Sequence, residues 1–104
     1  MALFGNIDMT VANGTPVSHT FTTNQNVIIG AYVANTSLET IQVTVTLRGK
    51  VLVPSAEIPV YTALSVLDGK ITANDTDVLE VSVDTVGGTA DVIFSTLEDA
   101  IATV

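Results

Sequence analysis

The chain has 104 residues, which is a common length for one domain and too short for two. Its 11 acidic residues outnumber its 3 lysines and arginines, and its formal net charge at pH 7 is −8. This balance argues against a nucleic-acid-binding surface, which needs several basic side chains to neutralise phosphates, and against binding to anionic membranes. We therefore expect neither nucleic acid nor membrane among its partners.

Apolar residues are in excess for a domain of this size. They make up 47% of the chain, while charged residues make up 13%, against about 25% in a typical soluble domain. Because a small domain cannot bury so much apolar surface alone, we expect part of it to lie against another chain. The absence of cysteine excludes disulfides and thiolate metal sites. The start, MALFGNIDM, lacks the basic region of a secretory signal, so we expect a soluble chain used without secretory export.

The first third of the chain predicts an irregular start and two strands. Residues 1–16 mix Gly, Asn and Pro with isolated apolar residues, which is typical of an N-terminal arm or an irregular first strand, with a turn at Asn13-Gly14. Residues 17–22, VSHTFT, are short and β-branched and predict a strand. Residues 27–33 are apolar on both faces, as in a central strand, and Gly30 within them indicates a bulge.

The segment 40–48, TIQVTVTLR, has the most regular pattern in the chain. Every second residue is apolar, namely Ile41, Val43, Val45 and Leu47. A period of two predicts a strand with one face in the core. Gly49 then permits a tight reversal into residues 50–53, KVLV. Residues 54–59, PSAEIP, predict a crossing loop or an edge segment, because proline cannot donate to a β ladder.

The remaining segments alternate between strands and turns. Residues 60–67, 78–84 and 90–98 predict strands, with a short segment KIT at 70–72, and the turns fall at Asp68-Gly69, residues 73–77 and residues 85–89. About seven or eight strands with regularly spaced turns predict an all-β fold. We expect a single antiparallel β-sandwich over residues 17–98, either Ig-like or jelly-roll, followed by a C-terminal tail at 99–104.

Two positions invite a chemical interpretation. His19 is the only histidine, and without a neighbouring carboxylate in sequence we interpret it as a solvent-facing strand residue. Asp75 and Asp77 have a spacing that suits calcium ligands, but the chain lacks the glycine and glutamate of an EF-hand loop there. Asn and Asp also cap turns through their own backbone, which favours a structural role. Whether this turn binds calcium stays open.

The other polar groups fit structural roles. Glu98 and Asp99 are adjacent, and Glu57 and Glu80 stand alone, in a chain with few aromatic residues to line a sugar cleft. The glycine pair in VGGT lies between two predicted strands, so there is no helix N-terminus there to bind phosphate. We expect no catalytic, cofactor-binding or metal-binding residues, no cofactor, and no enzymatic activity.

Residues 58–83, IPVYTALSVLDGKITANDTDVLEVSV, and the later ADVIFSTLE resemble a pattern of small virion structural proteins of tailed bacteriophages. In that pattern an IP-x-x-x-x-L-x-VL-x-GK segment leads to a D-x-L-x-V strand and a closing A-D-V…S…LE strand. The upstream VIIGAYVANTS and TIQVTV also fit, so the resemblance covers roughly residues 27–98. The matching positions in the two segments are Ile58, Pro59, Leu64, Val66, Leu67, Gly69, Lys70, Asp77, Leu79, Val81, Ala90, Asp91, Val92, Ser95, Leu97 and Glu98.

This resemblance implies a virion component without an active site. It favours a capsid decoration (cement) protein that is made in the host cytoplasm, self-associates as a trimer, and docks on the outer surface of the major capsid protein. A net charge of −8 suits the capsid exterior, since packaged DNA would repel it. One alternative is a phage tail, neck or fibre-attachment module. Another, from a different class, is a carbohydrate-binding β-sandwich module.

Overall fold

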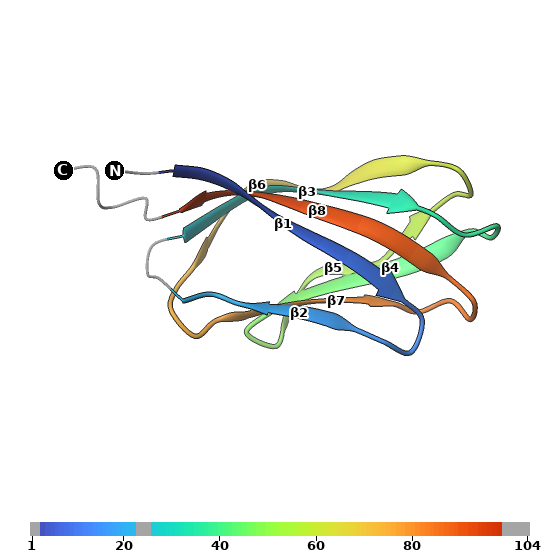
Figure 1. The fold of residues 1–104 in the computed structure, drawn as a ribbon, viewed down its shortest axis with the longest axis horizontal. Helices are drawn as coiled ribbons and strands as arrows, with labels where there is room; N and C mark the ends of the chain where they lie inside the picture. The colour runs from blue at the N-terminus through green and yellow to red at the C-terminus, as the bar shows by residue number, and fades with distance from the viewer. Residues whose placement is uncertain (1–2, 23–25, 99–104) are drawn as a thin grey trace.

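The computed structural model of the chain describes residues 3–22 and 26–98, and their regular structure is entirely β (Figure 1). This confirms the predicted all-β sandwich. Among these residues, no helix is long and apolar enough to cross a membrane. The strands are β1 (Leu3–Ala12), β2 (Val17–Thr20), β3 (Asn26–Asn35), β4 (Ile41–Leu47), β5 (Lys50–Ile58), β6 (Ala63–Ala73), β7 (Val78–Val83) and β8 (Thr89–Glu98).

The eight strands form two antiparallel sheets that pack face to face (Figure 1). Sheet A has the strand order β1-β8-β3-β6, and sheet B has the order β2-β7-β4-β5. The chain changes sheet at every connection except the β4–β5 hairpin, which stays within sheet B. Eight strands wound in this order form a jelly roll. The sequence left Ig-like and jelly-roll sandwiches open, and the strand order selects the jelly roll.

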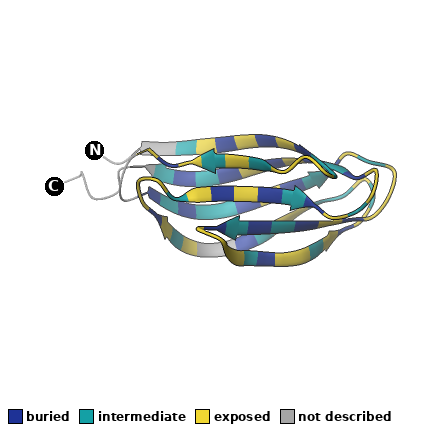
Figure 2. Ribbon diagram, turned by 90° about the horizontal axis from the view of Figure 1, so that it is seen from below, coloured by how far each residue is buried: buried dark blue, intermediate teal, exposed yellow. Residues whose placement is uncertain are grey.

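The hydrophobic core lies between the inner faces of the two sheets. In β4 the alternating apolar residues Ile41, Val43, Val45 and Leu47 are each at most 1% exposed, whereas Gln42 points outward and is exposed. Burying one such side chain contributes about 1.5–3 kcal/mol of transfer free energy. Figure 2 shows the same alternation as buried and exposed bands along the strands. The strand predicted from the period of two is therefore confirmed.

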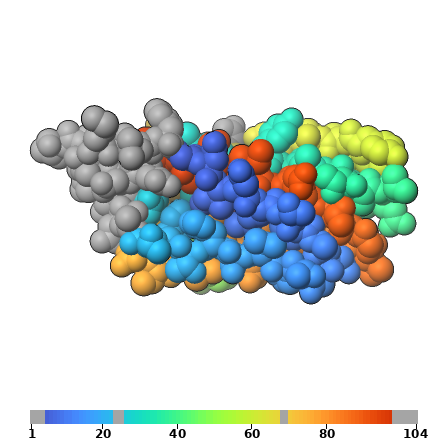
Figure 3. Space-filling view, viewed as in Figure 1, coloured from blue at the N-terminus to red at the C-terminus, as the bar shows by residue number. Residues whose placement is uncertain are grey.

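The N-terminal segment is a regular strand rather than an arm. β1 pairs with β8 over ten residues in one continuous register, and its residues Ile7, Met9 and Val11 are buried in the core. The polar residues between them and the glycine at position 5 weaken the apolar signal, so the sequence pattern is less clear here than in β4. Figure 3 shows β1 in dark blue on the face turned to the viewer, next to β2. The turn predicted at Asn13-Gly14 follows β1, with Gly14 at φ 81°.

The bulge predicted at Gly30 is present and decides which side chains β3 exposes. The register of β3 shifts between Ile28 and Gly30 against both of its neighbours, β6 and β8. An extra residue at this point reverses the inward and outward alternation along the strand. Ile28 and Val33 therefore both lie in the core, although they are an odd number of positions apart, and Tyr32 points outward.

One expected turn is absent from the structure, and one expected edge segment is present. The Asp68-Gly69 turn does not form, because this dipeptide lies inside β6, where Asp68 pairs with Gly30 of β3. Pairing with the bulged part of β3 thus overrides the local turn preference. The segment 54–59 is an edge segment, as one of the two alternatives predicted: residues 54–58 belong to β5 at the end of sheet B, with Ser55 at φ 48°, and Pro59 follows the strand. The predicted tail at 99–104 lies outside the described residues.

Candidate interaction surface

The single histidine is half-buried instead of facing solvent. His19 lies on β2 opposite the buried Leu79 of β7, and its ring meets the ring of Phe21 edge-on at a centroid distance of 5.0 Å. The interpretation of a solvent-facing residue is therefore wrong. An inward position and an aromatic neighbour give His19 a packing role, which sequence spacing alone does not reveal because Leu79 is 60 residues away in the chain.

The Asp75–Asp77 turn is held by an ion pair. The Asp77 Oδ2 atom accepts a hydrogen bond from the backbone N–H of Asn74 at 2.8 Å and another from Arg48 Nη1 at 2.7 Å. Both donors lower the pKa of Asp77 below its ordinary value of 3.8, and the Asn74 backbone N–H has a larger effect than Arg48. A guanidinium beside Asp77 already supplies the positive charge that a calcium ion would bring.

No metal cluster accompanies this turn. Among the side chains that the structure describes, no group of three or more His, Asp or Glu is placed to hold an ion. The hydrogen bonds that Asp77 accepts from the Asn74 N–H and from Arg48 cap this turn. The acidic pair Glu98 and Asp99 lies outside the side chains that the structure describes, while Glu57 and Glu80 are exposed on separate strands of sheet B.

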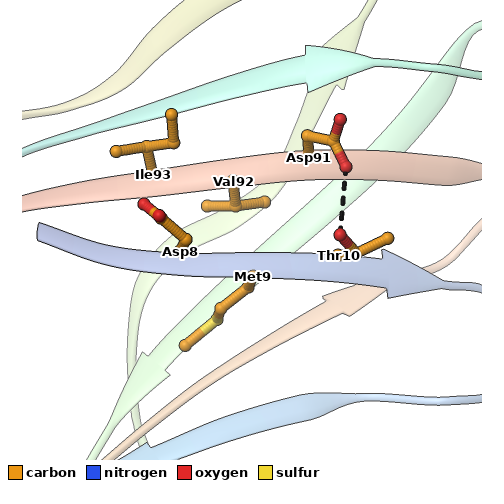
Figure 4. Close-up of a pocket in the computed structure, with 6 residues that line it drawn as sticks. All are labelled: Asp8, Met9, Thr10, Asp91, Val92 and Ile93. Atoms are coloured by element: carbon orange, nitrogen blue, oxygen red, sulfur yellow. Dashed lines mark hydrogen bonds between the residues drawn. The ribbon is translucent and has the colours of Figure 1, made fainter.

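The outer face of sheet A combines apolar and acidic side chains. Tyr32 of β3 and Ile93 of β8 are cross-strand partners, 51% and 44% exposed, and Asp8 of β1 pairs with Ile93 on its other side. Asp91 lies two residues before Ile93 on β8, on the same face of the sheet. Its carboxylate accepts a hydrogen bond from the Thr10 hydroxyl at 3.2 Å. Figure 4 shows Asp8, Asp91 and Ile93 around one hollow of this face.

Two open hollows lie side by side on this face and share Ile93. The first, of about 310 Å³, is lined by residues of β1 and β8 that include Asp8 and Asp91 (Figure 4). The second, of about 380 Å³, is lined by Gly30, Tyr32 and neighbouring residues of β3, β6 and β8. Neither contains a histidine or a basic residue among its lining groups. This arrangement suits a contact with another polypeptide better than an enclosed small-molecule site.

The centre of the outer face of sheet B is polar. Thr44 donates to the Asp84 carboxylate at 2.7 Å and its hydroxyl accepts the Ser55 N–H, so the centre of this face is a network of hydroxyls and acids. Glu80 and Glu57 are exposed on the same face. Acidic groups therefore occur on the outside of both sheets. Exposed apolar side chains also occur on both, namely Tyr32, Leu64 and Ile93 on sheet A and Val51 and Val78 on sheet B.

Three neighbouring loops at one end of the sandwich present apolar side chains. Leu38 in the β3–β4 loop, Tyr61 in the β5–β6 loop and Val86 in the β7–β8 loop are each about 80% exposed. Backbone hydrogen bonds join these loops, from Asn35 N–H to the Thr62 carbonyl at 3.0 Å and from Thr36 N–H to the Thr89 carbonyl at 3.1 Å. This end adds to the apolar surface that the composition predicts (Figure 2, right-hand end).

Comparisons with known proteins show the fold but no family. No family model matches the sequence, and no curated protein matches it. Among solved structures, the crystal structure of the Drosophila NLP core matches with a TM-score of 0.59 at 11% sequence identity, covering 88% of this chain and 96% of that one. Its title reports pentamer formation and histone binding. At this identity, the likeness shows a shared β-sandwich fold.

This comparison overturns the predicted capsid decoration function. The structure that shares the fold forms a pentamer and binds histones, which points away from a trimer and from the major capsid protein as partner. The tail, neck or fibre module and the carbohydrate-binding module gain no support from it either. The resemblance to bacteriophage virion proteins and the location on a virion stay predictions, because no match tests them.

Proposed function

We propose that this chain is a non-enzymatic binding protein whose acidic jelly-roll domain associates with copies of itself and holds a basic protein partner. The observation that carries the proposal is the display of acidic side chains on the outside of both sheets, in a chain of net charge −8. The fold shared with a histone-binding core supports the same interpretation.

The charge distribution favours a cationic partner. Asp8 and Asp91 on sheet A and Glu57, Glu80 and Asp84 on sheet B are all exposed. Arg48 is paired with Asp77. Such a surface attracts a lysine- and arginine-rich chain, speeds its association and repels acidic competitors. Histones are proteins of this chemical class.

Self-association is supported by the apolar surface. Tyr32 and Ile93 form an apolar patch on sheet A, and Leu38, Tyr61 and Val86 add apolar groups at the loop end. An exposed apolar surface on a small domain commonly marks an interaction site. Because the Drosophila NLP core forms a pentamer, we expect a ring of five chains in preference to a dimer or trimer.

Two measurements test this proposal. Isothermal titration calorimetry with purified core histones should give micromolar binding at about 50 mM salt and at least tenfold weaker binding at about 300 mM, since salt screens exposed charges. An acidic protein of similar size should give no heat of binding. Analytical ultracentrifugation of the chain alone at micromolar concentration should show a five-chain species. Absence of histone binding at low salt would refute the binding role, and a monomer would refute the ring.

A further inference from the structure

The outer edge of β1 has no strand partner among the described residues. In the part of the chain that the structure describes, β1 is the terminal strand of sheet A, so only its side facing β8 is paired. It runs for ten residues without a register shift and contains neither proline nor a basic residue. A long, regular edge of this kind presents a row of backbone donors and acceptors to which another strand can pair.

The other three sheet edges carry features that discourage such pairing. β2 is only four residues long. β5 contains Pro54 and shifts register twice against β4. β6 shifts register twice against β3 and carries the exposed Lys70. Short strands, prolines, irregular register and lysine are the usual means by which proteins protect an edge, and β1 has none of them.

Charge decides which kind of strand the β1 edge accepts. Asp8 is exposed near the middle of β1, on the outer face, and the neighbouring hollow contains Asp91 (Figure 4). Pairing β1 with β1 of a second copy about a two-fold axis would bring the two Asp8 carboxylates close together on one face, between chains of net charge −8 each. Like charges on neighbouring strands are destabilising. A strand with basic side chains at these positions would be attracted instead.

We propose that the β1 edge binds an extended basic segment of the partner protein, which adds a fifth strand to sheet A. This inference rests on the proposed function, which supplies a basic partner. The outward lysines or arginines of the segment lie beside Asp8 and reach the hollow that Asp91 lines, with their aliphatic stems near Ile93. The inward side chains cover the open side of the sandwich near β2, where Val17 and His19 are half-buried. The recognised pattern is therefore alternating basic and apolar residues.

A peptide experiment tests this assignment on the full chain. The probe is an eight-residue peptide of alternating lysine and valine, and fluorescence anisotropy measures its binding. A peptide of alternating glutamate and valine should bind at least tenfold more weakly, because its charge has the wrong sign. The lysine–valine peptide with every backbone nitrogen methylated should also lose at least tenfold, because it keeps its charges but cannot donate to the edge. Hydrogen exchange should slow in residues 3–12 when the unmethylated peptide binds.

Variants locate the site. Asp8→Asn should weaken the lysine–valine peptide about fivefold, which is the range of one exposed charge pair. The matched control Glu39→Gln removes one negative charge from the exposed β3–β4 loop and should change binding by less than twofold. Equal binding of the methylated and unmethylated peptides, or protection at β5 or β6 instead of β1, would overturn the inference. Histone binding that persists while the unmethylated peptide fails to bind would also overturn it and leave the proposed function standing.

Discussion

Arg48 and Asp77 join two turns that lie 29 residues apart, with 2.7 Å between Arg48 Nη1 and Asp77 Oδ2. Arg48 sits in the β4–β5 hairpin of sheet B with φ 53°, followed by Gly49 with φ 76°. Positive φ at both central residues is the geometry of a tight two-residue hairpin turn. The guanidinium also reaches the Thr72 carbonyl of β6 in sheet A, at 3.4 Å. One side chain therefore ties a hairpin of one sheet to the end of the other.

The Arg48–Asp77 pair makes stability depend on pH in the acidic range. The pKa of Asp77 is lower in the folded protein than its ordinary value of 3.8, so the unfolded chain binds more protons between the two values. The contribution is fully present above the unfolded pKa and is lost as pH falls through the folded one. We expect Asp77→Asn to lower the Tm at pH 7, and we expect its difference in Tm from the parent chain to shrink as the pH falls below 3.8. Thermal unfolding followed by circular dichroism measures the Tm of the variant and of the parent chain at each pH. A constant difference in Tm across this range would contradict the pair's role.

Asn35 should be the most costly buried polar residue to replace. Its side chain is buried, its Nδ2 donates to the Glu39 and Ile58 carbonyls at 2.7 and 3.0 Å, and its Oδ1 accepts from the N–H and hydroxyl of Ser37. Asn35→Ala removes these four hydrogen bonds and leaves only the bond from the Ser37 hydroxyl to the Glu39 carbonyl, so it should destabilise the fold by about 2–4 kcal/mol. Urea unfolding measures this loss in the free energy of unfolding.

A polar exchange at an exposed position provides the control for Asn35. Thr36→Ala removes a hydroxyl that forms a 2.7 Å hydrogen bond with the Thr89 hydroxyl at the surface. We expect a change of about 0.5 kcal/mol or less, since water replaces the lost partner. Similar losses for the two variants would show that Asn35 does not organise the junction of β3, the β3–β4 loop and β5.

Thr96→Val should stabilise the protein. Thr96 is 1% exposed, and its hydroxyl is the one buried side-chain polar atom without a hydrogen-bond partner in the described part of the chain. Replacing this hydroxyl with a methyl of similar shape should add about 1 kcal/mol to the free energy of unfolding. Thr10→Val is the control, because its exposed hydroxyl already has Asp91 as partner and should gain nothing. Loss of stability in Thr96→Val would indicate a bound water at the hydroxyl.

Gly88→Ala should destabilise the turn before β8. A Cβ at this position would lie 2.8 Å from methyl carbons of both Ile41 and Val83, which are branched core side chains with little freedom to move. Overpacking of this kind costs about 1–3 kcal/mol. Gly30→Ala is the matched control, because the nearest atom to its Cβ would be the Leu67 carbonyl oxygen at 3.8 Å. Chemical denaturation should show a clear loss for Gly88→Ala and less than about 0.5 kcal/mol for Gly30→Ala.

The candidate interaction surface was only partly visible in the sequence. The excess of apolar and acidic residues predicted a contact surface, but the pattern did not show that Tyr32 and Ile93 meet on one face with Asp8 beside them. Their pairing depends on the bulge near Gly30 and on registers between strands more than 60 residues apart. The role of β1 was hidden for the same reason, since a polar edge strand resembles an arm until its partner β8 is known.

Local residue patterns by themselves determined the all-β class, the strand over residues 41–47, and the turns near Asn13-Gly14 and at Gly49. A period of two and a preference for positive φ are properties of neighbouring residues, so they survive without any knowledge of the fold. Only the tertiary structure decided the jelly-roll order, the extended state of Asp68-Gly69, and the pairing of Arg48 with Asp77. These depend on which distant strands share hydrogen bonds, and many strand orders satisfy the same local pattern.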